Sequence, residues 1–194
     1  MLYNNLMDQA LFIWISIIVI FLLGSLSHFL YDLSHENKIL GLFTAVNEST
    51  WEHVKIAITP TIIWSLIDGY IYGVNPNYFA AKLASLLILT FFIPLVFYSY
   101  TRTTKKPILP IDIATFLVAI ILAQFVFLVI VNQPAIPYWA TYLSTIACFI
   151  YFGCYMTLTL MPLKQFPFKD PITGQYGFRA HRNFFKSLKK KSKK

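Results

Sequence analysis

The chain of 194 residues is 57% hydrophobic and only 12% charged, with a mean hydropathy of +0.62. Because a soluble domain carries about 25% charged residues, this composition excludes an ordinary water-soluble globular protein and predicts an integral membrane protein. The net charge of +8 does not indicate nucleic-acid binding, since ten of the sixteen Lys and Arg lie from Lys164 onward without a recognisable reading module. A basic end of this kind is typical of a topology signal that contacts anionic lipid headgroups.

Five apolar segments are each long enough to cross a bilayer as a helix at about 1.5 Å per residue. We predict membrane spans over residues 10–31, 51–72, 78–100, 111–131 and 138–160. In the first span, Gly24, Ser25 and Ser27 form a patch of small residues that another helix can approach closely. The predicted fold is therefore an all-α, polytopic membrane helix bundle of residues 1–163, followed by a basic tail of residues 164–194.

The connections between the spans carry the polar signals. Residues 39–46 are apolar but too few to cross a bilayer, which predicts an interfacial or re-entrant segment. Ser49 and Glu52 match the capping-box pattern at the start of the second helix. Asp68, near the end of that helix, is expected to pair with Lys82 across the turn that follows.

The distribution of basic residues predicts the orientation of the chain. The turns at residues 73–77 and 132–137 contain no Lys or Arg, whereas the loop at 101–110 contains three and the tail contains ten. Because basic residues favour the cytoplasmic side, the N-terminus is predicted to lie outside and the tail in the cytoplasm. The connection between the first two spans then also faces the cytoplasm.

Polar residues gather where the first span ends and the second begins. This region holds four of the eight acidic residues and three of the four histidines. Charged groups near a membrane are candidates for function, and we single out as a candidate polar site His28, Asp32, Glu48, Glu52 and His53. His28 and Asp32 are four residues apart on one helix face, and so are Glu48 and Glu52 if the second helix begins early. His53 follows Glu52 directly, about 100° further around a helix, so these two side chains cannot meet at one point.

Three interpretations of this region are open. In a purely structural one, Ser49 and Glu52 cap the second helix, Lys55 pairs with Glu52 or Glu48, and Trp51 anchors the protein at the headgroup level. In the second, a divalent metal ion such as zinc is bound, since imidazole and carboxylate together suit first-row metals. The metal ligands would then come from His28, Asp32, Glu48 and His53.

The metal interpretation extends to catalysis. A metal-activated water at the cytoplasmic interface would attack a lipid or a lipid-linked ester, which would make the protein a metal-dependent membrane hydrolase. The third interpretation is a ligand-binding or transport site, for which Pro60, Pro94 and the segment 39–46 would supply irregular backbone. A structural or partner-binding membrane subunit without chemistry of its own is the remaining alternative.

Two sequence stretches resemble a known family. Residues 46–53, Val-Asn-Glu-Ser-Thr-Trp-Glu-His, with Ser-His-Phe-Leu-Tyr at residues 27–31 before them, and residues 168–177, which include Asp-Pro-Ile-Thr-Gly-Gln-Tyr-Gly, are similar to motifs of a family of small uncharacterised bacterial multi-pass membrane proteins. The resemblance covers most of the chain. It implies a shared membrane fold and a location in a bacterial plasma membrane, and it transfers no activity. The sequence as a whole predicts a membrane protein with a polar pocket for a metal ion or small ligand.

Overall fold

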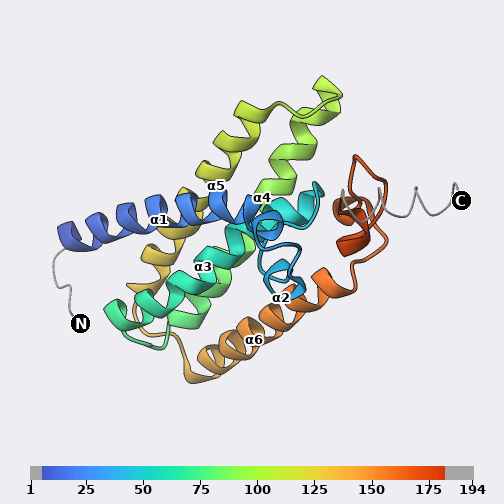
Figure 1. The fold of residues 1–194 in the computed structure, drawn as a ribbon. Coiled ribbons are helices and arrows are strands. Elements are labelled where there is room, and N and C mark those ends of the chain that lie inside the picture. Colours follow the sequence, from blue (N-terminus) through green and yellow to red (C-terminus); the bar gives the residue numbers. More distant parts are fainter. Residues whose placement is uncertain (1–5, 182–194) are drawn as a thin grey trace, which may run out of the picture.

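The structure is a computed structural model that describes residues 6–181, and this part of the chain is helical (Figure 1). Its helices are α1 (Leu6–Leu33), α2 (Lys38–Gly41), α3 (Thr50–Tyr72), α4 (Tyr78–Thr104), α5 (Leu109–Val131), α6 (Tyr138–Leu160) and two short 3-10 helices, η1 (Phe166–Phe168) and η2 (Gly177–Ala180). Five of these helices, α1 and α3 to α6, are long and apolar enough to cross a membrane. The predicted all-α fold with five membrane-spanning helices is confirmed.

The loop between α4 and α5 is shorter than the sequence predicts. α4 continues for a turn beyond the expected end, through Thr104, and stops where Lys105 adopts a left-handed conformation with φ of 59° and donates its N–H to the Thr101 carbonyl. α5 begins already at Leu109, because Pro110 lies in the first helical turn, where a missing N–H costs no hydrogen bond. Pro110 therefore lies in the first turn of a helix, whereas the sequence predicted it to lie in a loop.

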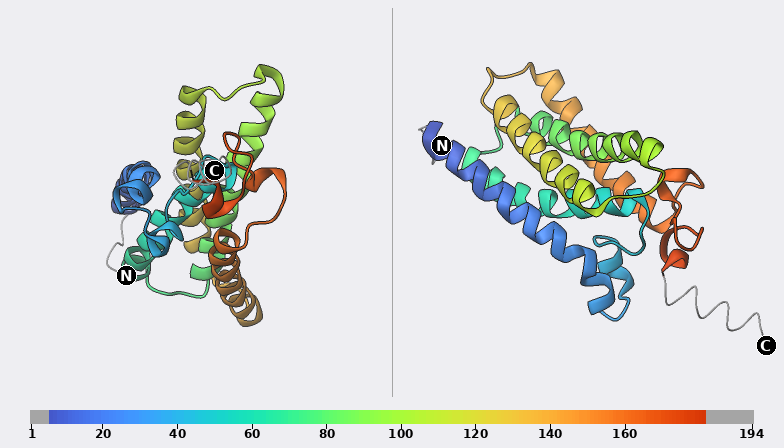
Figure 2. Two further views of the ribbon diagram at one scale, coloured as in Figure 1. Left: turned by 45° about the vertical axis from the view of Figure 1, so that its right-hand side comes forward. Right: turned by 90° about the horizontal axis from the view of Figure 1, so that it is seen from above.

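The helices form a bundle in which α3, α4 and α5 occupy the middle. α1 packs on α3 and α5, whereas α6 packs mainly on α4, so that α1 and α6 lie at different edges of the bundle (Figure 2). The core consists of aliphatic, small and aromatic side chains from all five long helices, including Ile13, Ile20, Ala57, Ile58, Ala81, Leu89, Ile120, Phe127 and Tyr155. Large apolar side chains also cover the outer faces, as on Leu66, Leu95 and Phe149. This outward apolar surface suits a protein whose solvent is lipid.

α1 and α3 approach each other closely at Gly24. A Cβ atom at this position would lie 2.7 Å from the Ile56 carbonyl oxygen and 2.6 Å from Phe116 Cζ. Pro60, four residues later and without an N–H, cannot donate the α-helical hydrogen bond to this Ile56 carbonyl. α3 nevertheless continues through Pro60, and the predicted close approach at the small-residue patch is observed.

The connection between α1 and α3 is folded back against the bundle. α1 ends at Leu33, and the next turn contains two non-glycine residues in left-handed conformation, His35 and Glu36, with φ of 55° and 62°. These two side chains therefore do not continue the face of α1 that carries His28. After α2, the chain returns to α3 through a loop whose Thr44, Ala45 and Val46 are buried.

The segment after α6 packs across the same end of the bundle (Figure 1). η1 packs against α3 and η2 against α6, and an isolated bridge joins Lys169 to Tyr176. The Trp51 ring, with its centroid 5.2 Å from that of Phe168, contacts this segment. Residues 182–194 of the predicted basic tail lie outside the described residues.

Candidate metal centre

Three of the five candidate residues come together where α1 ends and α3 begins. His28 lies in the last turns of α1, Glu48 in the loop before α3, and His53 in the first turn of α3. Glu48 Oε2 is 3.7 Å from Nε2 of His28 and 3.7 Å from Nε2 of His53. One ligand atom from each of the three residues lies within 4.8 Å of the others. The side chains are 27% exposed for His28, 45% for Glu48 and 38% for His53, which leaves the group open to an incoming ion.

A backbone hydrogen bond fixes the orientation of the His53 ring. Nδ1 of His53 lies 3.0 Å from the Ser49 carbonyl oxygen. Because a carbonyl only accepts hydrogen bonds, Nδ1 carries the proton in this contact, and the lone pair of Nε2 is left for the cluster. This is the arrangement by which metal-binding histidines are usually held. The His28 ring packs beside it, with 5.4 Å between the ring centroids.

The three side chains suit a divalent metal ion by their chemistry, and two of their three separations are near the spacing that such an ion needs. Zinc takes nitrogen and oxygen ligands at about 2.0–2.2 Å in tetrahedral geometry, which separates neighbouring ligand atoms by about 3.4 Å. The two 3.7 Å separations around Glu48 are close to that value. Two imidazoles and one carboxylate would supply three ligands to such an ion, fewer than the four of a closed structural zinc site and as many as protein side chains provide in catalytic zinc sites.

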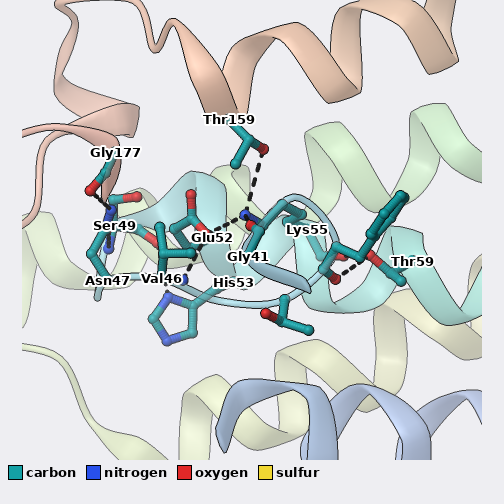
Figure 3. Close-up of polar contacts among 12 residues, drawn as sticks. Gly41, Val46, Asn47, Ser49, Glu52, His53, Lys55, Thr59, Thr159 and Gly177 are labelled. Atoms are coloured by element: carbon teal, nitrogen blue, oxygen red, sulfur yellow. Dashed lines mark hydrogen bonds and ion pairs between the residues drawn. The ribbon is translucent and has the colours of Figure 1, made fainter. Parts of the chain in front are cut away.

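Glu52 does not belong to this cluster. Its Oε2 accepts a hydrogen bond of 3.0 Å from the Val46 N–H and forms an ion pair of 2.6 Å with Lys55 Nζ, and both charged side chains are buried. Figure 3 shows the His53 ring turned away from Glu52 and Lys55, as expected for neighbouring residues on a helix. Glu48 and Glu52 do not share a helix face, because the early helix start that this prediction required is not observed and α3 begins only at Thr50.

The predicted capping box is also wrong in its hydrogen bonds. Ser49 is the residue before α3, as expected, but its side chain makes no capping hydrogen bond. Glu52 uses its carboxylate on Val46 instead of reaching back to the Ser49 N–H, which is paired with Asn47 Oδ1 at 2.8 Å. Electrostatics explain the difference, because a buried Lys55 draws Glu52 into the bundle.

Lys55 and Thr59 hold the folded-back connection against α3 (Figure 3). Lys55 Nζ donates to the Gly41 carbonyl at 2.9 Å and to Thr159 Oγ1 at 3.4 Å. One turn further along α3, Thr59 Oγ1 donates to the Phe43 carbonyl at 2.6 Å. The predicted pairing of Lys55 with Glu52 is therefore observed, and it forms part of a network that joins the connection, α3 and α6.

Asp32 contacts a histidine that the sequence did not predict as its partner. Although it lies one helical turn from His28, its Oδ1 contacts Nε2 of His181 at 2.8 Å, and Glu36 Oε1 lies 3.7 Å from Nδ1 of the same ring. Asp32 is thus not part of the three-residue cluster. No local pattern links these side chains, since 149 positions separate Asp32 from His181.

Trp51 differs from its expected role as a headgroup anchor. Its ring is packed on Phe168, and its Nε1 is buried without a hydrogen-bond partner in the described part of the chain. An interfacial anchor needs its N–H in the wet headgroup layer, so Trp51 instead joins α3 to the segment after α6.

A second polar pair lies at the opposite end of α3. Asp68 and Lys82 form the predicted ion pair, both side chains are buried, and the Lys82 ammonium also lies over the Phe127 ring at 3.9 Å from its centroid. A cavity of about 210 Å³ between α3, α4 and α6 reaches Lys82. This cavity is lined by residues of the middle and far half of the bundle and is separate from the three-residue cluster.

Together, the five apolar helices and the polar cluster at one end of the bundle define a multi-pass integral membrane protein with a candidate metal centre. The chain belongs to DUF6512, a family of unknown function whose profile matches residues 1–178. The expected membership of an uncharacterised family is thereby confirmed, and both motif stretches lie within the matched region. No curated protein and no solved structure matches the chain.

Proposed function

We propose that this membrane protein binds a divalent transition-metal ion, with zinc the best fit, through His28, Glu48 and His53. The observation that carries the proposal is the convergence of two imidazole nitrogens and one carboxylate oxygen within 4.8 Å, from three separate segments of the chain. Neutral imidazole and carboxylate suit zinc and its first-row neighbours better than they suit calcium or magnesium, which prefer oxygen ligands alone.

We place the site at the cytoplasmic surface of a bacterial plasma membrane, with the N-terminus outside. The basic residues of the α4–α5 loop and of the tail support this orientation. The resemblance of residues 46–53 and 168–177 to a bacterial family supports the compartment. In this orientation the metal site faces the cytoplasmic lipid headgroups, which the basic tail would also contact.

A set of three protein ligands, as in catalytic zinc sites, favours a second candidate function, a metal-dependent hydrolase. A zinc-bound water loses its proton near neutral pH and becomes a nucleophile. At the lipid interface its substrate would be a lipid or lipid-linked ester. A structural or partner-binding subunit would require no metal, and metal binding therefore separates it from both other candidates.

Zinc titration of the purified protein in detergent tests the proposal. We expect one zinc ion per chain for the wild type. We expect that His28→Ala, Glu48→Gln and His53→Ala each weaken binding by more than the roughly 10–100-fold that loss of a supporting residue costs. The hydrolase candidate adds that zinc-loaded wild type cleaves a fluorogenic phospholipid ester in mixed micelles, and that the same three variants do not.

Matched controls come from neighbouring residues that the geometry excludes. Asp32→Asn removes an acid one helical turn from His28, and His181→Gln removes a histidine at the same end of the bundle. Both variants are expected to bind zinc within about twofold of wild type. Absence of stoichiometric zinc in the folded wild type, or equal loss in Asp32→Asn, would reject the three-residue site.

A further inference from the structure

The turn formed by residues 170–177 is built around the carboxylate of Asp170. Asp170 is only 2% exposed. Its Oδ2 accepts from the Thr173 N–H at 2.7 Å and from Thr173 Oγ1 at 2.5 Å, while its backbone N–H donates to the Gln175 carbonyl at 2.9 Å. Gly174 adopts a φ of 70°, the left-handed conformation that favours glycine. The hydrogen bonds within the turn therefore use Oδ2 of the Asp170 carboxylate and leave Oδ1 for a donor outside the turn.

The spare oxygen reaches the candidate metal centre. Asp170 Oδ1 accepts a hydrogen bond of 3.1 Å from the backbone N–H of Glu48, across 122 positions of sequence. The residue before Glu48 is tied to the same turn, because Asn47 Nδ2 donates to the Gly177 carbonyl at 3.1 Å. Residues 46–53 and 168–177, the two motif stretches of the sequence, are thus hydrogen-bonded to each other next to the three-residue cluster.

Glu48 depends on this support more than the two histidines do. His28 and His53 stand on long helices, whereas Glu48 lies in the loop before α3 begins at Thr50. The Glu48 side chain is 45% exposed, and its only ion-pair contacts in the described part of the chain are with the two histidines. The backbone at residues 47–49 therefore fixes where the Glu48 side chain begins, and its contacts with the two histidines orient the carboxylate.

We propose that Asp170 is a positioning residue of the metal centre, which holds the Glu48 backbone so that the carboxylate faces His28 and His53. This inference rests on the proposed metal-binding function. It assigns to the turn after α6 a specific role in a site formed by α1 and α3. Residues that hold a metal ligand in place typically contribute about 10–100-fold to metal affinity.

Asp170→Asn is the sharpest substitution, because it changes one oxygen to NH2 at almost constant volume. Donors approach both carboxylate oxygens of Asp170, from Glu48 on one side and Thr173 on the other. An amide places an NH2 donor against one of them whichever way it is turned. Buried donors that face each other lose their hydrogen bonds, so either the turn or the Glu48 contact is released.

Two measurements on the full chain in detergent test the inference. For Asp170→Asn we expect zinc affinity to fall by about 10–100-fold, with an altered visible spectrum of the cobalt-substituted site. We also expect faster amide hydrogen exchange in residues 46–50 of the metal-free protein, with exchange in α4 and α5 unchanged. Asp170→Glu, which keeps the acceptor, is expected to recover part of the affinity.

Two controls separate positioning from general loosening of the tail. His181→Gln breaks the contact of the tail with Asp32 but leaves Asp170 in place, and Asp112→Asn removes an acid bonded to Tyr100 away from the site. Zinc affinity in both is expected to stay within about twofold of wild type. Wild-type affinity in Asp170→Ala, which removes both acceptor oxygens, or an equal fall in His181→Gln, would overturn the positioning role. If the wild type binds no zinc, the proposed function fails, and the positioning role then stands or falls on the exchange at residues 46–50.

Discussion

At the scale of single residues, loss of one partner of the buried ion pair of Glu52 and Lys55 is expected to lower stability strongly. Both side chains are buried, at 2% and 0% exposure, with 2.6 Å between the charged atoms. Lys55→Met leaves the Glu52 charge uncompensated, and removal of one partner of a buried pair costs about 3–5 kcal/mol. We therefore expect a loss of that size in the free energy of unfolding, measured by denaturant titration in mixed micelles.

The double variant Glu52→Gln/Lys55→Met is the matched control for this prediction. It removes both charges, and Gln retains an oxygen that can accept from the Val46 N–H. We expect it to be clearly more stable than Lys55→Met alone, which gives a large coupling energy in the double-mutant cycle. Strictly additive losses would mean that the two charges do not stabilise each other.

Helical spacing in the sequence identified the side chains at the polar end of the bundle, but it did not identify all their ion-pair and hydrogen-bond partners. The i, i+3 spacing of Glu52 and Lys55 favoured their pairing, which is observed. The i, i+4 spacing of His28 and Asp32 suggested a shared site, yet Asp32 binds His181. Helical spacing states which side chains can share a face, whereas tertiary contacts decide which partner is nearest. The contact between Asp170 and Glu48 joins two loops, and no helical or strand periodicity describes it.

At the scale of secondary-structure elements, the packing of α1 on α3 depends on Gly24. A Cβ here would lie 2.7 Å from the Ile56 carbonyl, a backbone atom that cannot rotate away. Gly24→Ala should therefore push α1 from α3 and cost about 1–3 kcal/mol of stability, the usual penalty for overpacking. Because His28 lies one helical turn further along α1, we also expect weaker zinc binding, measured in the same titration as for the wild type.

Gly153→Ala is the matched control in α6. Apart from its chain neighbours and the backbone of its own helix, no atom of residues 6–181 lies within 4 Å of a Cβ at this position. The substitution should leave stability unchanged or raise it slightly, since alanine favours helix by up to about 1 kcal/mol over glycine. A destabilisation equal to that of Gly24→Ala would show that helix packing at Gly24 is not the cause.

The elements themselves were largely predictable because a bilayer imposes a simple length requirement. About twenty apolar residues are needed to cross it, and each predicted span corresponds to one long helix. The ends were less predictable. α4 continues through Thr104 and ends where Lys105 adopts a left-handed conformation, and hydropathy contains no information on such a turn. The short α2 and the turn at His35 and Glu36 were missed for the same reason.

At the scale of the whole molecule, the two ends of the bundle carry different polar and charged groups. The candidate metal centre, the Glu52–Lys55 network and the segment after α6 lie at one end, and the Asp68–Lys82 pair lies towards the other. The turns at the second end, residues 73–77 and 132–137, contain no basic residue. The distribution of charge therefore predicts which end faces the cytoplasm, whereas the fold alone is compatible with either orientation.

Cysteine labelling of intact cells tests this orientation directly. In a background with Cys148→Ala and Cys154→Ala, Val74→Cys and Ala135→Cys lie in exposed turns, and Thr103→Cys lies exposed near the end of α4. None of these three changes alters a charge. Since basic residues favour the cytoplasmic side, a membrane-impermeant maleimide should label the first two in intact cells and Thr103→Cys only after permeabilisation. The reverse pattern would place the metal centre on the outer surface and would exclude substrates that exist only in the cytoplasm.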